Sequence, residues 1–132
     1  MAFRIESSRP VTPKRKPVKD DGYLNFVRKL PCLITLKPAE AAHVSMENSL
    51  YGHAGRGKGQ KASDRWAVPL SHQFHMRSHE YAKGEIKWWI GMKINPYIIA
   101  LILHGIYTEA GMVGLSRAEE VCRNARSIGR WG

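Results

Sequence analysis

The chain has 132 residues, of which 43% are hydrophobic and 9% aromatic, and it carries 21 Lys and Arg against 11 Asp and Glu. That length suits one domain with a modest core, and the apolar content excludes a disordered chain. The formal net charge of +10 favours a polyanionic partner, above all nucleic acid.

Cysteine content and hydropathy indicate the compartment. Cys32 and Cys122 are too few for a disulfide framework, and no secretory signal follows Met1. The most apolar stretch, residues 88–107, is interrupted by polar residues and by Pro96. It falls short of the roughly 20 apolar residues of a membrane span. We therefore expect a cytoplasmic protein that associates with nucleic acid and not with a membrane.

The N-terminal segment differs in composition from the rest. Residues 1–20 contain six basic and two acidic side chains and almost no large apolar ones. This predicts a flexible basic arm over residues 1–20, followed by a single domain over residues 21–132. Because the arm contributes only +4, the domain keeps +6 of its own and should itself attract a polyanion.

The first elements alternate between strand and helix patterns. Apolar residues at helical spacing from Tyr23 to Leu30 predict a helix that ends at Pro31. Residues 40–44 and 65–70 read as short strands, separated by a glycine-rich segment without regular structure. Ser71 is placed to cap a helix that runs to about residue 83. The order is strand, long basic loop, strand, helix.

Two further helices are predicted near the C-terminus. Pro96 suits the first turn of a helix over residues 96–110. Ser116 is expected to cap a helix over residues 117–126 through a capping box with Glu119. The adjacent Trp88 and Trp89 are expected to pack in the core, with one of them partly exposed, and stacking on bases is the alternative. The fold class predicted from these elements is α+β.

Three histidines lie on the strand–loop–strand–helix unit. His75 and His79 are four residues apart, so their rings project from one helix face and can hold one divalent ion. A solvated pair on an exposed helix face is the alternative. His43 ends the first predicted strand, and a hairpin packed on the helix would bring it toward this pair. A metal on a phosphate beside a neutral imidazole that deprotonates water suits phosphodiester hydrolysis.

Several short motifs follow one another in a characteristic order. They are Leu30-Pro31-Cys32, Ala41-Ala42-His43-Val44, the run Gly57-Lys58-Gly59-x-Lys61-x-x-Asp64, Val68-Pro69-Leu70, His75-x3-His79 and the segment from Trp88 to Pro96. Through them, residues 23–105 resemble HNH nucleases, and more narrowly the phage and prophage HNH proteins of the recombination-enhancement (Ref-like) kind. The resemblance implies a ββα-metal (HNH) core with a long glycine-rich basic loop, flanked by additional α-helices.

The same resemblance implies an activity and a set of partners. The activity is that of a metal-dependent endonuclease that hydrolyses DNA phosphodiester bonds in phage or prophage recombination or DNA processing. The expected partners are DNA and a recombinase filament or another phage or host DNA-processing protein. One divalent metal ion is implied as the cofactor, and Mg²⁺, Mn²⁺, Zn²⁺ and Ni²⁺ all remain open.

Roles for individual residues also follow from the resemblance. His43 corresponds to the general base, and His75 and His79 correspond to the metal ligands. Asp64 falls near the Asn or Asp position that braces the loop or helps to hold the metal. A turn residue that pairs with a neighbouring basic side chain is an equally weighted interpretation of Asp64.

This sequence departs from the family pattern at the zinc-binding cysteines. Many relatives hold a structural zinc with two Cys-x-x-Cys pairs. In this chain the first pair keeps Cys32 but has Thr35 in place of its second cysteine. The second pair is replaced by Ser71 and Phe74. One thiolate cannot replace four, so no structural zinc is expected, and Cys32 is expected to be buried.

A second departure concerns the catalytic metal. Ala42 stands where colicin-like HNH sites carry a third histidine ligand. The remaining positions on the ion would be filled by water and phosphate, or by a third ligand from Asp64, His72 or Glu40. An open site of this kind suits catalysis but lowers the metal affinity.

The glycine-rich loop is a candidate phosphate-binding segment. It carries Arg56, Lys58 and Lys61, and Arg65 follows shortly after. Glycine lets backbone amides approach phosphates closely, and the cations neutralise them. These four residues are the predicted nucleic-acid-binding side chains. A loop that merely connects two strands is the alternative interpretation.

Other function classes remain in competition. An inactive DNA-binding or structural module on an HNH fold is the chief rival, because Ala42 and the missing cysteines fit it. A ribonuclease stays open, since the chemistry concerns the phosphate more than the sugar. A zinc peptidase is disfavoured, because Met76 stands where the glutamate of His-Glu-x-x-His would be.

Overall fold

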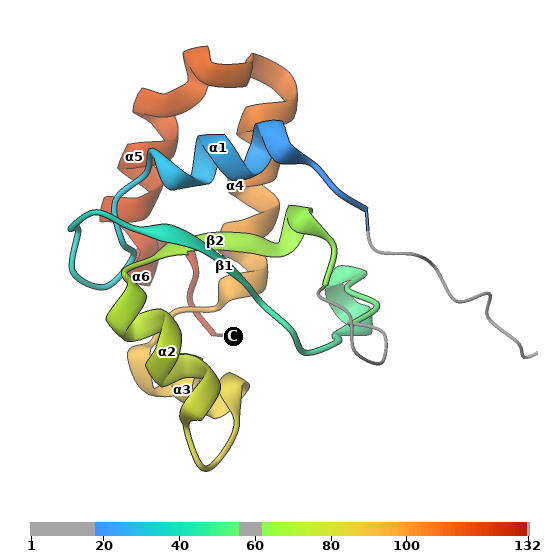
Figure 1. Cartoon of the computed structure of the whole chain (residues 1–132), viewed down its shortest axis with the longest axis vertical. Helices are drawn as coiled ribbons and strands as arrows, with labels where there is room; N and C mark the ends of the chain where they lie inside the picture. Colours follow the sequence, from blue (N-terminus) through green and yellow to red (C-terminus); the bar gives the residue numbers. More distant parts are fainter. Residues whose placement is uncertain (1–17, 56–61, 132) are drawn as a thin grey trace, which may run out of the picture.

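The structure is a computed structural model that describes residues 18–55 and 62–131 (Figure 1). Its helices and strands are α1 (Asp21–Arg28), β1 (Glu40–His43), β2 (Ala67–Leu70), α2 (His72–Glu80), α3 (Glu85–Met92), α4 (Pro96–Ala110), α5 (Leu115–Arg123) and α6 (Ala125–Ile128). Short 3-10 turns occupy Ser49–Tyr51, Asp64–Trp66 and Gly111–Gly114. The fold is α+β, as the sequence predicted.

The two strands form one antiparallel ladder in the middle of the molecule. Glu40 pairs with Leu70 at one end, and His43 pairs with Ala67 at the other. α2 begins directly after β2, so the expected order of strand, loop, strand and helix is present. In Figure 1 the ladder runs between α1 on one side and α2 on the other, with α4 crossing behind it.

The core lies between the sheet and the longer helices. Tyr23 and Phe26 of α1, Leu70 of β2 and Leu103 of α4 are completely buried. The Tyr23 hydroxyl donates a hydrogen bond to the carbonyl oxygen of Ala67 at 2.9 Å, which fixes α1 on β2. Burial of these rings and aliphatic side chains is the main stabilising contribution to such a domain.

The structure contains a helix that the sequence analysis did not predict. α3 covers residues 85–92 and buries both Trp88 and Trp89. Their expected place in the core is confirmed, but the partial exposure expected for one of them is wrong. Gly84 precedes this helix with a φ of 100°, a conformation that glycine adopts without steric cost. The carboxylate of Glu85 accepts a hydrogen bond from the backbone N–H of Ser45 at 3.2 Å. α3 is therefore tied to the chain that continues from β1.

Two predicted boundaries are wrong near β2 and α2. The strand predicted from Arg65 begins at Ala67, because Asp64–Trp66 forms a 3-10 turn. α2 ends at Glu80 and not at residue 83. Ser71 is the N-cap residue, as predicted, but its side chain makes no capping hydrogen bond.

The predicted capping box of the last helix is also wrong. α5 begins at Leu115 with Gly114 as N-cap, so Ser116 lies inside the first turn. A Cβ atom on Gly114 would stand 2.5 Å from Cγ2 of Ile106, well inside the closest real contacts. Close packing of the 3-10 turn on α4 therefore requires glycine there and fixes where α5 begins. The chain turns again at Asn124 and continues as α6.

One helical stretch of the described residues, Pro96–Arg123, is long and apolar enough to cross a membrane by length and composition. The stretch is bent, because α4 ends at Ala110 and a 3-10 turn leads into α5. α4 also buries Ile99 and Leu103 in the core. Core helices pass the same test, so this stretch is weak evidence for a membrane.

His53, which lies in the glycine-rich segment between the two strands, is buried. Its Nε2–H donates to the carbonyl oxygen of Val44 at 2.6 Å, and its Nδ1 accepts from the N–H of Gly55 at 2.7 Å. The ring also stacks on Trp66, with ring centroids 4.5 Å apart. The bond from Gly55 requires the neutral imidazole, because protonation would place a proton on the accepting Nδ1.

The stability of the fold should therefore depend on the charge of His53. Burial lowers the pKa of His53 from its usual value of 6.5, so the unfolded chain takes up this proton more readily than the folded one. The free energy of unfolding should fall as the pH drops from about 7 to about 5. Urea denaturation across this range measures the effect. A His53→Gln variant should show a shallower decrease, whereas His72→Gln, which removes an exposed imidazole, should keep the wild-type slope. Equal slopes in all three proteins would contradict this role.

Candidate active site

A histidine and an aspartate form a hydrogen-bonded pair at the end of the ladder. Nε2 of His43 lies 2.8 Å from Oδ1 of Asp64, and the two side chains are only 14% and 12% exposed. His43 is the last residue of β1 and pairs with Ala67. Asp64 stands in the 3-10 turn just before β2, and that turn brings its carboxylate to the imidazole.

The short segment before α1, residues 18–20, holds Asp64 in place through hydrogen bonds. Oδ2 of Asp64 accepts a hydrogen bond from the backbone N–H of Asp20 at 2.6 Å. The N–H of Asp64 donates to the carbonyl oxygen of Val18 at 2.9 Å, and Val18 in turn donates to the hydroxyl of Ser63 at 2.9 Å. Both carboxylate oxygens of Asp64 are therefore engaged. Asp64 does lie in a turn, and its pairing with a basic neighbour stays a prediction because Lys61 lies outside the described residues.

The two helical histidines lie side by side, one turn apart on α2. The ring centroids of His75 and His79 are 5.0 Å apart. On the sheet side, Oε2 of Glu40 lies 2.5 Å from Nδ1 of His75, and Oε1 of Glu40 lies 3.2 Å from Nδ1 of His72. The pKa of Glu40 lies below its usual value, chiefly because His75 hydrogen-bonds to the carboxylate.

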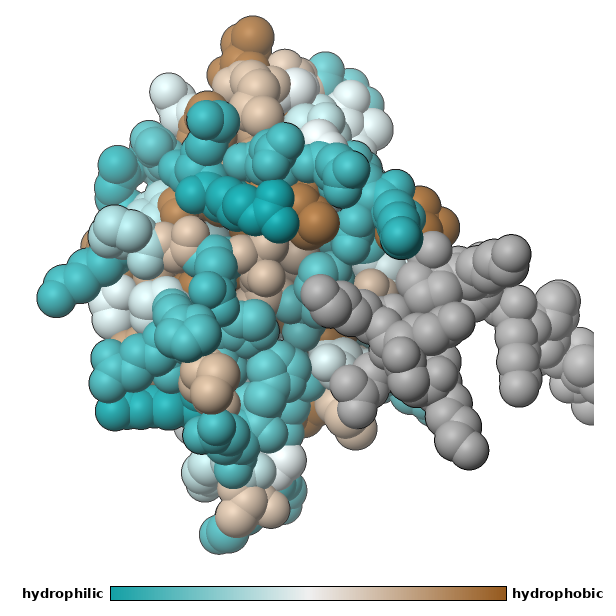
Figure 2. All heavy atoms as spheres, in the orientation of Figure 1, coloured by the Kyte–Doolittle hydropathy of each residue, from teal (hydrophilic) through white to brown (hydrophobic). Residues whose placement is uncertain are grey.

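One pocket joins these groups. It has a volume of about 520 Å³, and its lining residues come mainly from α1, β1 and α2. In Figure 1, α1 and α2 lie on either side of β1. Its lining side chains come from segments far apart in sequence and are Leu24, Arg28, Ala41, His43, Ser45, Ala62, His75 and His79. Figure 2 shows hydrophilic side chains over α1 and α2 on this side of the molecule. The three histidines that the sequence singled out therefore face a common space.

Arg28 is a member of this pocket that the sequence analysis missed. It lies in the last turn of α1, and its Nη1 donates to Oδ1 of Asn25 at 3.0 Å. A guanidinium at the edge of a pocket lined by imidazoles is well placed to bind a phosphate oxygen.

We expect Arg28→Ala to weaken DNA binding and to reduce its salt dependence. Loss of one phosphate contact should lower the slope of log K against log salt by about 1. Fluorescence anisotropy with a labelled duplex at several salt concentrations measures this slope. Arg117→Ala, which removes an exposed arginine of α5 away from the pocket, serves as the matched control. An unchanged slope in Arg28→Ala would exclude the phosphate contact.

Arg65, the one predicted binding residue within the described part of the chain, does not line the pocket. Arg65 is exposed, and its guanidinium lies over the ring of Trp66, 5.2 Å from the centroid. It is not among the side chains that line the pocket. Arg56, Lys58 and Lys61 lie outside the described residues. Their predicted contacts with nucleic acid remain predictions.

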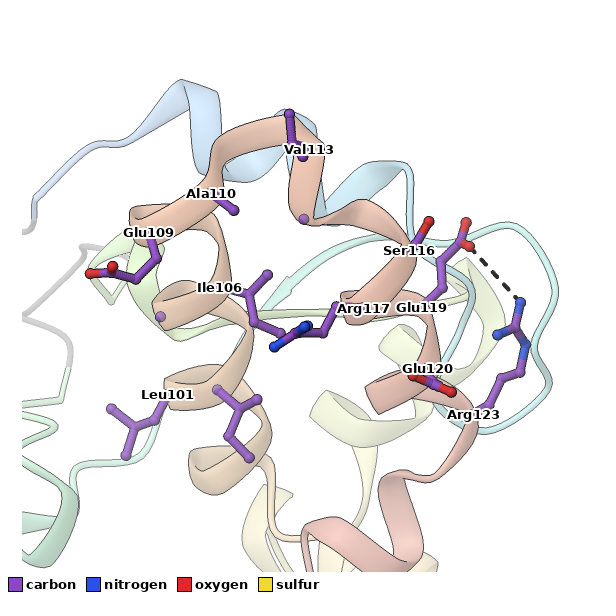
Figure 3. Close-up of a pocket in the computed structure, with 13 residues that line it drawn as sticks. Leu101, Ile106, Glu109, Ala110, Val113, Ser116, Arg117, Glu119, Glu120 and Arg123 are labelled. Carbon is purple, nitrogen blue, oxygen red and sulfur yellow. Dashed lines mark ion pairs between the residues drawn. The ribbon is translucent and has the colours of Figure 1, made fainter.

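A larger pocket, of about 1140 Å³, lies between α4 and α5 (Figure 3). Aliphatic side chains such as Leu101, Ile106 and Val113 line it, together with charged residues that include an ion pair between Glu119 and Arg123 at 3.9 Å. It contains no histidine. Its size does not make it the active-site candidate, because the side chains that suit proton transfer and metal binding are in the smaller pocket.

The donor set in the smaller pocket fits a metal ion with few protein ligands. Within residues 18–55 and 62–131, no group of three His, Cys, Asp or Glu side chains converges to hold an ion. His75 and His79 nevertheless share one pocket, and the contact with Glu40 at Nδ1 of His75 leaves Nε2 as the donor atom. Two imidazoles with water and phosphate oxygens make an open site of the catalytic kind.

Of the four zinc positions that the resemblance implies, Cys32 is buried and Phe74 packs against the core. Cys32 is completely buried, as expected, and the N–H of Ile34 donates to its sulfur at 3.4 Å. Phe74 packs against the core, with its ring centroid 6.3 Å from that of Trp88.

The comparisons with known proteins give one match. A family model described as "Protein of unknown function (DUF968)" matches residues 5–92. The match covers more than half of the chain, which belongs to this family. It includes both strands, α2 and α3, and so contains every residue of the pocket. The comparisons with curated proteins and with solved structures gave no match.

Proposed function

We propose that this protein is a metal-dependent endonuclease of the HNH (ββα-metal) class that hydrolyses DNA phosphodiester bonds. The observation that carries the proposal is the shared pocket, in which His43, paired with Asp64, faces the same space as His75 and His79. The net charge of +10 supports a nucleic-acid substrate. The order strand, loop, strand, helix agrees with the ββα core of that class.

His43 is the general base in this proposal. The carboxylate of Asp64 only accepts hydrogen bonds, so the neutral imidazole carries its proton on Nε2, and Nδ1 keeps its lone pair. Nδ1 then takes a proton from the attacking water. Asp64 orients the ring and stabilises the imidazolium that forms, as carboxylates do beside catalytic histidines elsewhere. A positioned general base contributes about 10²- to 10⁴-fold to the rate.

His75 and His79 would hold one divalent cation, Mg²⁺, Mn²⁺, Zn²⁺ or Ni²⁺. When bound, such an ion supplies stabilisation of the negative charge that develops on the phosphate and on the leaving oxygen. Arg28, at the edge of the same pocket, binds a further phosphate oxygen and orients the backbone. The pocket thus combines a base, a cation site and a phosphate anchor.

The wider setting follows from charge and from the resemblance to Ref-like proteins. DNA is the proposed substrate, and a recombinase filament or another phage or host DNA-processing protein is the proposed partner. We place the protein in the cytoplasm, associated with DNA, where it would act in phage or prophage recombination or DNA processing. We expect a low sequence preference, because the proposed contacts are with phosphate groups, which carry no sequence information.

Removal of divalent metal tests the proposal. Supercoiled plasmid is incubated with the protein and each of the four cations, with and without EDTA. We expect nicked or linear product with at least one cation and none with EDTA. Duplex binding without cutting under every condition, unchanged by EDTA, would identify an inactive DNA-binding module. Cutting of a matched RNA but not of the plasmid would identify a ribonuclease.

A further inference from the structure

Glu40 makes contacts that the proposed reaction does not yet use. It is the first residue of β1 and pairs with Leu70, two residues before α2 begins. This register places its carboxylate over the first turn of α2. There Oε2 lies 2.5 Å from Nδ1 of His75, and Oε1 lies 3.2 Å from Nδ1 of His72. Glu40 of β1 thus hydrogen-bonds to the ring of His75 on α2.

The contact has a chemical consequence for His75. An ionised carboxylate accepts hydrogen bonds and cannot donate them, so Nδ1 of the neutral His75 ring must carry the proton. Nε2 then keeps the lone pair that binds a metal. Histidines that bind metals commonly donate their other N–H to a carboxylate, which fixes the tautomer and the ring orientation.

The environment of Glu40 favours an indirect role over direct ligation. The side chain of Glu40 is 40% exposed. Glu40 is not among the residues that line the pocket with His43. Both of its oxygens face an Nδ1 atom of α2. His72, whose side chain is 74% exposed, gives the carboxylate a second and longer contact.

We propose that Glu40 is a positioning residue that fixes the tautomer and orientation of His75, so that Nε2 points toward the divalent cation. This inference rests on the proposed function, because it assumes that His75 is a ligand. It assigns Glu40 a place outside the metal's own ligand set, although the sequence alone left Glu40 open as a third ligand.

Zinc binding by the full chain tests the inference. Isothermal titration with Zn²⁺ should show an affinity about 10- to 100-fold weaker for Glu40→Ala than for wild type. Glu40→Gln should lose clearly less, because its amide oxygen still accepts the Nδ1–H of His75. Glu80→Ala removes an exposed carboxylate from α2, the helix that carries His75, and controls for the change in net charge. This variant should bind Zn²⁺ like wild type. Circular dichroism establishes that each variant is folded.

A measurement without metal separates this inference from the proposed function. Nitrogen-15 shifts of the His75 ring should report the Nδ1–H tautomer in wild type and in Glu40→Gln, and a shift toward the Nε2–H tautomer in Glu40→Ala. Affinities within twofold of wild type and an unchanged His75 tautomer in Glu40→Ala would overturn the positioning role. Equal losses of affinity in the Gln and Ala variants would indicate direct ligation or charge, and would overturn it too. Failure of wild type to bind any divalent ion would instead contradict the proposed function.

Discussion

Replacing His43 by alanine is expected to slow DNA cleavage by about 10²- to 10⁴-fold, the usual contribution of a positioned general base. The ring is held by Asp64 at 2.8 Å and opens onto the pocket that His75 and His79 also line. Apart from His75 and His79, which are the proposed metal ligands, no described side chain that lines the pocket can act as a base near neutral pH. DNA affinity and Zn²⁺ affinity should stay close to wild type, because His43 is not one of the proposed ligands.

The rate constant for plasmid nicking under single-turnover conditions measures this loss. Asp64→Asn should show a smaller decrease, since the base remains while its orientation and the stabilisation of its charged form are weakened. His104→Gln provides a matched control, because it removes a histidine of α4 outside the pocket. A His43→Ala variant that cuts within a few-fold of wild type would exclude His43 as the base.

Replacing His75 or His79 by alanine is expected to abolish both metal binding and cleavage. Each substitution removes one of two proposed protein ligands, so the loss of affinity should exceed the about 10- to 100-fold that is typical for an outer partner. The rings lie 5.0 Å apart on α2, and neither can compensate for the other. Titration with Zn²⁺ and the plasmid assay measure the two losses in the same preparations.

The pattern across variants distinguishes a ligand from a base. His43→Ala should bind Zn²⁺ and fail to cut, whereas His75→Ala and His79→Ala should fail in both measurements. DNA binding should survive in all three, because the cationic surface that attracts the duplex is unchanged. Should His75→Ala and His79→Ala cut DNA at the wild-type rate with the same requirement for metal, the proposed ligand assignment would be wrong.

The local parts of the site could be predicted from sequence. His75 and His79 share a helix face because four residues make about one turn, and that relation needs no tertiary information. His43 could be placed at a strand end, and the structure pairs it with Ala67 at the end of the ladder. The helix over residues 96–110 was predicted with its correct bounds, because Pro96 marks its first turn.

The parts that depend on packing could not be predicted in this way. Arg28 reaches the pocket only because α1 packs beside β1, and nothing in its local sequence indicates that contact. The bonds from Glu40 to α2 depend on the register of the strands. Asp64 was ambiguous because the 3-10 turn that brings it to His43 was taken for part of a strand. α3 was missed because its eight residues are too short to show a clear period.

The central claim is that the imidazole of His43 and the pair His75–His79 share one metal-binding pocket. Paramagnetic broadening of histidine ring signals by Mn²⁺ measures this most directly. The signals of His43, His75 and His79 should broaden first, whereas those of His53 and His104 should persist, and a His75→Ala/His79→Ala double variant should show no selective broadening. Equal broadening of all the histidines, or broadening that leaves His43 untouched while His75 and His79 disappear, would contradict the account.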